Sequence, residues 1–237
     1  MRPAGVQIKG LIEASLIDWP GRLATVVFLP GCNLRCRYCH AKALVLGVND
    51  IESIPLEKTL EYLSQMEGWI DGVVISGGEP TLQPHLPSLA AEIKSRGFAV
   101  KLDTNGTRPE VIEHLVSHRL VDAVSMDVKA PLDYRYAELA GTSLDLDSIR
   151  ASIAFLIRSG IDYEFRTTVS PFLLSASEVA EIAESLRGAA RYVLQPFLPH
   201  SCLDASLEDL PPCPLNFLED CSRLCSGFVG QVIIRGA

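Results

Sequence analysis

The sequence lacks the features that mark membrane, secreted and nucleic-acid-binding proteins. No apolar run in its 237 residues approaches the roughly 18 residues that span a bilayer. Lysine and arginine total 21 against 29 acidic residues, and the net charge of −8 argues against binding to a phosphate backbone or an anionic membrane. Residues 1–15 lack the continuous apolar stretch of a signal peptide. We therefore expect a cytoplasmic protein that binds small molecules or proteins, with no nucleic acid and no membrane.

The number of cysteines is odd, which argues against a disulfide framework. The chain has seven cysteines, and its hydrophobic content of 48% is ample for a core that needs no covalent cross-links. Three of them, Cys32, Cys36 and Cys39, follow the apolar run 24–29 with the spacing C-x3-C-x2-C. Metal binding or a reactive thiol is the explanation that this short loop favours.

Apolar runs and helical stripes alternate along the chain. Short apolar runs bounded by glycine or proline predict strands, and stripes with a period near 3.6 predict helices between them. Six such steps predict an α/β fold, a partial (β/α)6 TIM-like barrel of parallel strands with outer helices. We expect a single domain over 1–237, with a core at about 22–198 and a short C-terminal extension at 199–237, where the run 229–235 adds a closing strand. The expected strands are 25–29, 73–75, 98–102, 123–126, 162–169 and 192–197.

Polar and glycine-rich residues collect after nearly every expected strand. In a β/α barrel the carboxyl ends of the strands converge at one mouth, which holds the active site, whereas a doubly wound sheet uses only its switch-point loops. This distribution favours the barrel. The groups concerned are the three cysteines, Gly77 to Glu79, Asp103 to Asn105, Asp127 with Lys129, and Arg166.

Four uses of the cysteine loop fit parts of the spacing. A thioredoxin-like pair would use Cys36 and Cys39 and leave Cys32 unexplained. The run 36–40 also matches a c-type haem attachment pattern, which requires export. A structural zinc site needs a fourth ligand, and the next cysteine is distant Cys202. An iron–sulfur cluster takes cysteines from tight loops, and three ligands for four irons leave one iron open. Zinc and an iron–sulfur cluster remain the serious alternatives.

The three cysteines, with the aromatic Tyr38 between the last two, resemble the signature of radical SAM enzymes. The resemblance implies a 4Fe-4S cluster whose open iron binds S-adenosylmethionine and cleaves it reductively to a 5′-deoxyadenosyl radical. It also extends to Ser76-Gly77-Gly78-Glu79-Pro80, which is similar to the family's GGE motif. There the glycines let the backbone approach the cofactor, and Glu79 would accept from the methionyl ammonium. For this run alone, an ordinary strand-to-helix turn is the alternative.

Further residues are similar to positions that line the cofactor in this family. Asp127 and Lys129 lie two apart on one strand and so share a face, with Lys129 directed to the cofactor carboxylate and Asp127 to its ammonium or ribose. An internal salt bridge is the alternative for each, and no residue is assigned to the ribose with certainty. The candidate cofactor-binding residues are Tyr38, Gly77, Gly78, Glu79, Asp103, Thr104, Asn105, Asp127, Lys129 and Arg166, and the candidate metal ligands are Cys32, Cys36 and Cys39.

A narrower likeness begins upstream of the cysteines. Residues 10–12 and 17–21, with the cysteine loop, resemble the opening of the anaerobic ribonucleoside-triphosphate reductase activating proteins. This implies removal of a hydrogen atom from a backbone glycine of a glycyl-radical enzyme, an anaerobic ribonucleotide reductase, with flavodoxin or ferredoxin as electron donor. Leu198, where pyruvate formate-lyase activases place a histidine, favours the reductase branch. The alternatives are a radical SAM enzyme for a small molecule or another polypeptide, of the pyruvate formate-lyase-activating type, and a zinc-stabilised binding domain.

The remaining cysteines fit no metal-binding pattern. Cys221 and Cys225 lie one helical turn apart, and free cysteine is among the most buried residue types. We expect buried thiols here rather than a second metal site. Trp19 is expected to pack under the cysteine loop. The four cysteines in question are Cys202, Cys213, Cys221 and Cys225.

Overall fold

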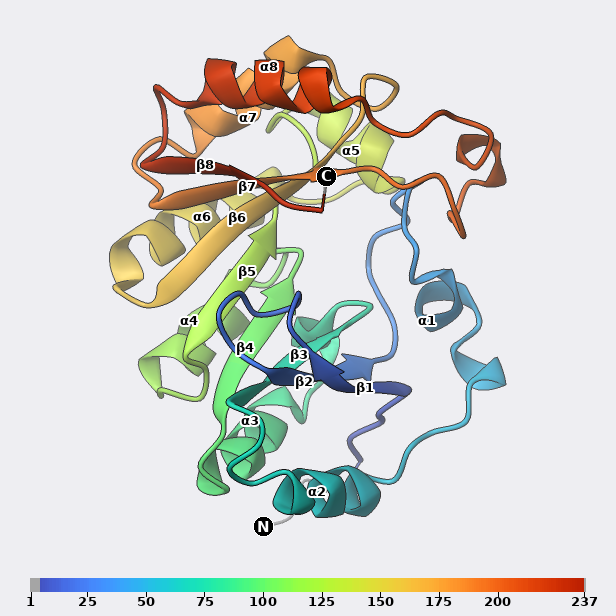
Figure 1. The fold of residues 1–237 in the computed structure, drawn as a ribbon, viewed down its shortest axis with the longest axis vertical. Helices are drawn as coiled ribbons and strands as arrows, with labels where there is room; N and C mark the ends of the chain where they lie inside the picture. Colours follow the sequence, from blue (N-terminus) through green and yellow to red (C-terminus); the bar gives the residue numbers. More distant parts are fainter. Residues whose placement is uncertain (1–4, 237) are drawn as a thin grey trace. The chain divides into compact units, whose positions relative to one another are not determined.

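The computed structural model describes residues 5–236 (Figure 1), so residues 1–4 and 237, at the ends of the expected domain, lie outside the described residues. The described chain forms two compact units, which are treated separately below. The first contains residues 5–33, 43–104 and 110–124, and the second contains residues 34–42, 105–109 and 125–236. The expectation of a single domain stays a prediction.

The strands follow one another in chain order across the sheet. The order is β1-β2-β3-β4-β5-β6-β7-β8, without the reversal that defines a doubly wound sheet. Pairing is parallel for β2 with β3, β3 with β4, β6 with β7, and β7 with β8. Strand β1 pairs with β2 in the antiparallel direction, with Gly10 opposite Phe28. The predicted α/β class, of the partial-barrel type with parallel strands, is confirmed, and the six expected strands are present as β2 to β7.

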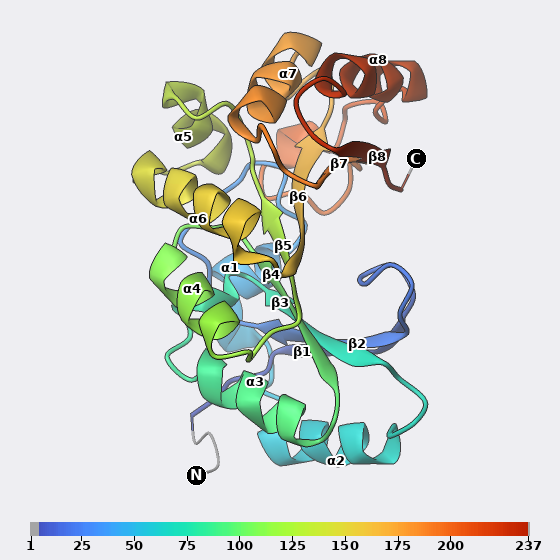
Figure 2. The same cartoon turned by 90° about the vertical axis from the view of Figure 1, so that its left-hand side faces the viewer.

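The first unit carries the strands at the amino-terminal side of the sheet. Figure 2 shows α3 and α4 lying along one face of these strands. The last residues of β4, Asp103 and Thr104, were expected to follow the strand and instead belong to it. The elements are β1 (Gly10–Ser15), β2 (Ala24–Leu29), α1 (Lys42–Leu46), the 3-10 turn Val48–Asp50, α2 (Leu56–Gln65), β3 (Gly72–Gly77), the 3-10 turn Pro80–Leu82, α3 (Leu86–Ser95), β4 (Ala99–Thr104) and α4 (Pro109–Ser117).

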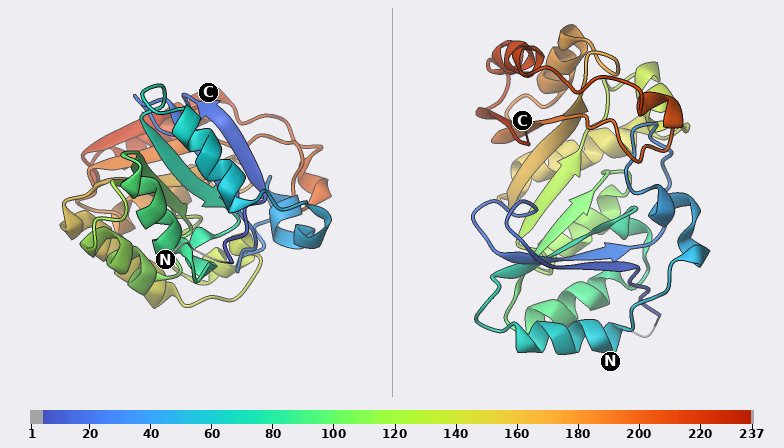
Figure 3. Two further views of the ribbon diagram at one scale, coloured as in Figure 1. Left: turned by 90° about the horizontal axis from the view of Figure 1, so that it is seen from below. Right: turned by 45° about the vertical axis from the view of Figure 1, so that its right-hand side comes forward.

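The second unit contains most of the remaining elements. Strand β5 is shared, because its first two residues belong to the first unit. Helices α7 and α8 pack against each other, and the right panel of Figure 3 shows the red helix α8 beside the orange α7. The elements are β5 (Ala123–Asp127), α5 (Tyr134–Ala140), α6 (Leu146–Ser159), β6 (Asp162–Val169), α7 (Ala176–Ser185), β7 (Arg191–Pro196), the 3-10 turn Ala205–Leu207, α8 (Leu215–Cys225) and β8 (Gln231–Ile234).

Local sequence signals account for the ends of the helices. The predicted capping box of α7 is present, because Ser175 accepts from the backbone N–H of Glu178 while the Glu178 side chain accepts from the Ser175 backbone. Helix α6 begins after Asp145, whose side chain accepts from the N–H of Asp147, and ends at Gly160 in the left-handed conformation. These caps provide hydrogen-bond partners for backbone N–H and C=O groups at the helix ends, which have no partner within the helix.

The closing strand expected near the C-terminus is confirmed as β8. It pairs with β7, and Arg235, just beyond it, donates from its two terminal nitrogens to the two carboxylate oxygens of Glu164 at 2.8 and 2.7 Å. Glu164 lies on β6 and is only 6% exposed, so the two hydrogen bonds compensate a carboxylate that has lost most of its water. This pair therefore ties the end of β8 to β6.

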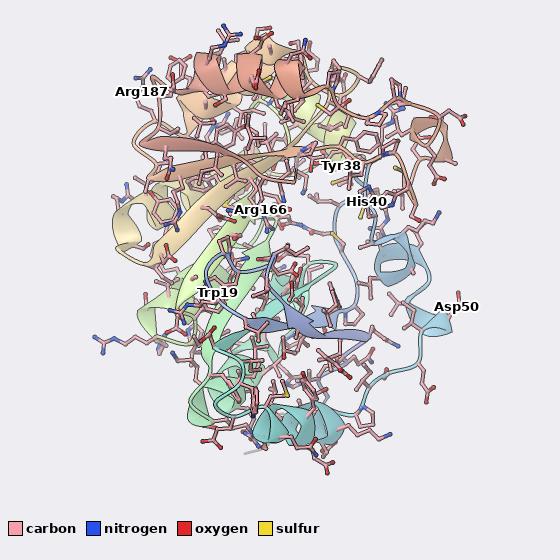
Figure 4. All side chains as sticks on the ribbon, viewed as in Figure 1. Trp19, Tyr38, His40, Asp50, Arg166 and Arg187 are labelled. Atoms are coloured by element: carbon pink, nitrogen blue, oxygen red, sulfur yellow. The ribbon has the colours of Figure 1, made fainter. Side chains whose placement is uncertain are left out.

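Trp19 was expected to pack under the cysteine loop, and that expectation stays a prediction. The ring of Trp19 (Figure 4) packs with Ala24, Val26 and Val74 of the first unit, and the partly buried Phe28 packs against the same cluster. Trp19 therefore belongs to the core of the first unit. None of the helices within residues 5–236 has the length and apolar character needed to cross a membrane.

Candidate active site

The cysteine loop runs from β2 to α1 without regular secondary structure over most of its length. Its first cysteine, Cys32, belongs to the first unit, and Cys36 and Cys39 belong to the second. Cys36 is buried, and the other two are partly exposed. None of the three forms a disulfide. Their sulfur atoms can therefore act as thiolate ligands.

In the first unit, the two glycines of the GGE motif touch the backbone at the start of the cysteine loop. The N–H of Gly78 donates to the oxygen of Leu29 at 2.9 Å, and the N–H of Glu79 donates to the oxygen of Gly31 at 2.7 Å. A methyl group at Gly77 would fall 2.2 Å from the Leu29 oxygen, and Gly77 also has a φ of +126°. Because neither position has room for a side chain, the motif fixes the path of the chain into Cys32.

The carboxylate of Glu79 is fully buried and collects several donors. Its Oε1 accepts from the backbone N–H of Thr81 at 3.0 Å, from the Thr81 hydroxyl at 2.5 Å and from the Thr104 hydroxyl at 2.8 Å. These hydrogen bonds hold the side chain in one orientation while it is out of water. The sequence analysis named Glu79 and Thr104 but missed Thr81, which also begins the 3-10 turn after the motif.

Asp103 forms an ion pair on its own strand. Its Oδ1 lies 2.6 Å from the Nζ of Lys101, two residues earlier on the same face of β4, and Lys101 also donates to the oxygen of Asp18 at 2.7 Å. The Lys101 side chain is 3% exposed and that of Asp103 is 11% exposed. The sequence analysis overlooked Lys101, although the strand period of two places it beside Asp103.

In the second unit, Asp127 lies between two cations. Its Oδ1 accepts from the Nε of Arg166 at 2.8 Å, and its Oδ2 accepts from the Nζ of Lys129 at 3.3 Å. Burial by itself would raise the pKa of Asp127, but the charges of Arg166 and Lys129 outweigh it and lower that pKa to about 2. The structure thus brings together three predicted residues as a charged triad.

Lys129 also faces an aromatic ring of the cysteine loop. Its Nζ lies 5.9 Å from the ring centroid of Tyr38, and both residues are buried. Burial would lower the pKa of Lys129, but the carboxylate of Asp127 outweighs it and raises that pKa well above its ordinary value. The ammonium is therefore kept charged beside Tyr38, in a place where water is largely excluded.

Asn105 has a local structural role in the second unit. Its Oδ1 accepts from the backbone N–H of Thr107 at 3.0 Å and from the Thr107 hydroxyl at 2.7 Å. This is the side-chain pattern that stabilises a tight turn after a strand. Gly106 follows within that turn with a φ of +76°, and a side chain there would meet Met126.

Helix α5 is an element of the second unit that the sequence analysis missed. The buried Tyr136 accepts the backbone N–H of Lys129 on its hydroxyl at 3.3 Å. At the end of the helix, the oxygen of Ala140 accepts from the N–H of Arg35, next to Cys36, at 2.8 Å. One helix therefore touches both Lys129 and the cysteine loop. The Asp133 cap and the glycine at 141, eight residues apart, were the available signal.

The expected burial of the C-terminal thiols is confirmed for three of the four. Cys202, Cys221 and Cys225 are buried, and Cys213 is partly exposed. Burial raises the pKa of Cys221 to about 11 and that of Cys225 to about 12, so both remain thiols at neutral pH. Within residues 5–236, no three Cys, His, Asp or Glu side chains are gathered as a ready-made metal site. The assignment of cluster ligands therefore depends on the loop spacing and on family membership.

Comparison with known proteins identifies the class. The model of the Radical SAM superfamily matches residues 26–192, so the chain belongs to that superfamily of enzymes. It is 33% identical over 233 residues to a Methanocaldococcus jannaschii protein named "putative glycyl-radical enzyme activating enzyme", covering 96% of this chain and 95% of that one. It is 28% identical to the pyruvate formate-lyase-activating enzyme of Clostridium pasteurianum, covering 81% and 82%. The structure of Streptococcus suis SuiB bound to S-adenosylmethionine shares the fold, with a TM-score of 0.67, 14% identity, and coverage of 90% of this chain and 52% of SuiB.

The superfamily implies S-adenosylmethionine and an iron–sulfur cluster as cofactors. The chemistry of this chain fits both. Three cysteines of one short loop, none of them in a disulfide, supply soft thiolate ligands, and the carboxylate of Glu79 and the ammonium of Lys129 each offer a charge opposite to one of the two charged groups of a methionyl moiety. Membership in this enzyme superfamily also sets aside the alternative of a zinc-stabilised binding domain.

Proposed function

We propose that this protein is a radical SAM activase that removes a hydrogen atom from a backbone glycine of a partner glycyl-radical enzyme. The observation that carries the proposal is the 33% identity, over 96% of this chain, to a relative named for that activity. The nearly equal lengths of the two proteins support a shared function, because 95% of the relative is covered as well.

Cys32, Cys36 and Cys39 are proposed to bind a 4Fe-4S cluster through three of its irons. The chemistry that the bound cofactors supply is reductive cleavage of S-adenosylmethionine to a 5′-deoxyadenosyl radical. The protein's own contribution is to place the ligands and to keep water and oxidants away. The burial of Cys36 and of the neighbouring Tyr38 supports the proposal that the protein keeps water and oxidants away from the cluster.

In the first unit, Glu79 is proposed to accept a hydrogen bond from the methionyl ammonium, with Gly77 and Gly78 allowing close backbone approach. The donors Thr81 and Thr104 hold its carboxylate in one orientation. Asp103 is proposed to act at the same strand end, with its charge balanced by Lys101.

In the second unit, Lys129 is proposed to bind the cofactor carboxylate. Asp127 keeps Lys129 charged and oriented, and Arg166 holds the carboxylate of Asp127 in place. Tyr38 offers an apolar ring face, and Asn105 shapes the turn after β4. No residue is assigned to the ribose.

The partner is proposed to be an anaerobic ribonucleotide reductase, with flavodoxin or ferredoxin as the electron donor. The support is the likeness of residues 10–12 and 17–21 to the reductase activating proteins, and the presence of Leu198 where pyruvate formate-lyase activases have histidine. The second candidate is a pyruvate formate-lyase-type partner, which the 28% identity to the Clostridium pasteurianum enzyme favours.

Anaerobic reconstitution tests the proposal in two stages. About four irons per chain and dithionite-dependent formation of 5′-deoxyadenosine are expected of a cluster with one open iron. The reconstituted protein is then mixed separately with a ribonucleotide reductase and a pyruvate formate-lyase of the glycyl-radical type. A glycyl EPR doublet only with the reductase supports the proposed partner, and a doublet only with the lyase selects the second candidate. Formation of 5′-deoxyadenosine without either doublet would point to a different substrate.

A further inference from the structure

The cysteine loop of the second unit depends on other segments for its conformation. Residues 34–41 form neither helix nor strand, so their backbone N–H and C=O groups lack the regular hydrogen bonds of those elements. The bond from Cys39 N–H to the Cys36 oxygen, at 3.0 Å, closes a single turn between the two thiols. Helix α5 holds the loop at Arg35, on the N-terminal side of Cys36. The C-terminal side is held by a different part of the chain.

That part is the tail segment, defined here as residues 197–208. Arg37 lies between Cys36 and Cys39 and donates from Nε to the Oδ2 of Asp204 at 2.9 Å, with its terminal nitrogen at 2.8 Å from the same oxygen. In return, the backbone N–H of Asp204 donates to the oxygen of Arg37 at 2.9 Å. Side chain and backbone are thus both engaged, which fixes the loop more firmly than an ion pair alone.

A second set of contacts holds the loop just beyond Cys39. The Nε2 of His40 lies 2.9 Å from the backbone oxygen of Leu198, and its ring stacks on that of His200 with centroids 4.6 Å apart. Figure 4 labels His40 beside Tyr38 on the loop. Lys42 lies 3.8 Å from Glu208, which also accepts the N–H of Cys202. The tail segment therefore follows the loop from Arg37 to Lys42.

The tail segment is itself ordered by short-range contacts. Asp204 caps the 3-10 turn Ala205–Leu207 by accepting from the N–H of Ser206 on Oδ1, while its Oδ2 faces Arg37. The side chains of Leu207 and Cys202 are buried. One carboxylate thus joins a folded part of the tail to the loop.

We propose that Asp204, paired with Arg37, is a positioning residue that holds Cys36 and Cys39 in place for their metal before the metal binds. A loop ordered in advance loses less conformational entropy on ligation, so the ligand is held more tightly. This inference rests on the proposed function, because tighter metal binding requires the proposed cluster. The ordering of the cysteine loop by Asp204 is a property of the metal-free protein. Asp204 lies within the part of the chain, 199–237, that was expected to be only a short extension.

A charge-reversal cycle tests the proposal in metal-free protein under reducing conditions. Asp204→Arg and Arg37→Asp are each expected to speed amide hydrogen exchange in peptides covering residues 36–40, and the double variant is expected to restore protection. The double variant still lacks the cap that Asp204 provides to the 3-10 turn. Restored protection from exchange in that variant would therefore be due to the ion pair between positions 37 and 204. Asp220→Arg, which breaks the exposed Asp220–Arg223 pair on α8, is the matched control and should leave these peptides unchanged. Thermal unfolding verifies that each variant is folded.

The same variants are then reconstituted with iron and sulfide and challenged with a chelator. Loss of iron should be about two- to fivefold faster in each single reversal, as expected for a partly exposed ion pair, and near the wild-type rate in the double variant. Exchange and iron loss no faster in Asp204→Arg than in Asp220→Arg would overturn the proposal. If the wild type itself binds no iron, the proposed function fails, while the exchange data still decide whether the pair orders the loop.

Discussion

The backbone oxygen of Gly31 occupies the space that a side chain at Gly78 would need. A methyl group on Gly78 would fall 1.9 Å from that oxygen, well inside van der Waals contact. Gly31 directly precedes Cys32, and its oxygen also accepts the N–H of Glu79 at 2.7 Å. Glycine at position 78 therefore allows the GGE motif to lie close to the segment that leads into Cys32, the first predicted ligand.

Gly78→Ala is expected to lower the free energy of unfolding by about 1–3 kcal/mol, because backbone atoms must move to admit the methyl group. Urea unfolding of the metal-free protein measures the change. Gly227→Ala is the control, since its methyl group would have no neighbour within 4 Å. Equal stability of the two variants would contradict the observed packing.

Gly141→Ala should disturb the cysteine loop, whereas Gly160→Ala should not. Both glycines end helices with similar φ values, 66° and 72°, so both substitutions carry a left-handed strain of roughly 1–2 kcal/mol. Only at Gly141 would the methyl group meet another segment, at 2.1 Å from the oxygen of Arg35. Hydrogen exchange at residues 34–40 is expected to increase in Gly141→Ala alone. The same exchange in both variants would show that α5 does not hold the loop.

Glu79→Gln is expected to weaken binding of S-adenosylmethionine to the reconstituted protein by about tenfold to a hundredfold. A neutral amide loses the charge-assisted hydrogen bond to the ammonium, worth about 1.5–3 kcal/mol. Its oxygen can still accept from Thr81 and Thr104, so the fold should persist. Equilibrium dialysis measures the dissociation constant, with Glu113→Gln on the exposed face of α4 as control. Unchanged affinity would remove Glu79 from the proposed binding residues.

Asp127 predicts a specific dependence of stability on pH. Its pKa in the folded protein, about 2, lies below the ordinary value of 3.8, so the folded state favours the ionised form. The resulting stability is fully present above about pH 4 and is lost as the pH falls toward 2. The side chain is 34% exposed, and solvent screening limits the contribution to about 1–2 kcal/mol.

Asp127→Asn should therefore be less stable than the wild type at pH 6, with a smaller difference at pH 3. Urea unfolding at both pH values, on metal-free protein, gives the two differences. Asp209→Asn is the control, because the side chain of Asp209 is exposed and lies just beyond the tail segment. A difference between wild type and Asp127→Asn that stays constant over this range would show that the triad does not lower the Asp127 pKa.

Much of the fold could be predicted because its signals are local. The strand at 162–169 was predicted with its observed bounds, and the capping box at Ser175 and Glu178 is formed by residues three apart. Strand β1 was missed because its identity depends on antiparallel pairing with β2, a contact between distant residues. Helix α5 was missed although it had a cap, because its seven residues are too few for a clear helical period.

The candidate site residues show the same difference between what local sequence predicts and what depends on contacts between distant residues. The spacing of Cys32, Cys36 and Cys39 by itself allowed a metal site or a reactive thiol, and the motifs after it indicated the superfamily. That Asp127 lies between Lys129 and Arg166 required β5 and β6 to be brought together, since Arg166 is 39 residues away in sequence. Asp103 was predicted as a cofactor residue, but its ion pair with Lys101 became evident only in the folded strand.

The sequence alone determined the ligand type, the order of strands β2 to β7 and, through the resemblance of its motifs, the class of chemistry, because spacing, periodicity and short motifs are properties of neighbouring residues. The tertiary structure decided what holds those ligands. Helix α5 reaches Arg35, and Asp204 reaches Arg37 from 167 residues further along the chain. Such partners are chosen by packing and charge in three dimensions, so no local pattern around the cysteines could have named them.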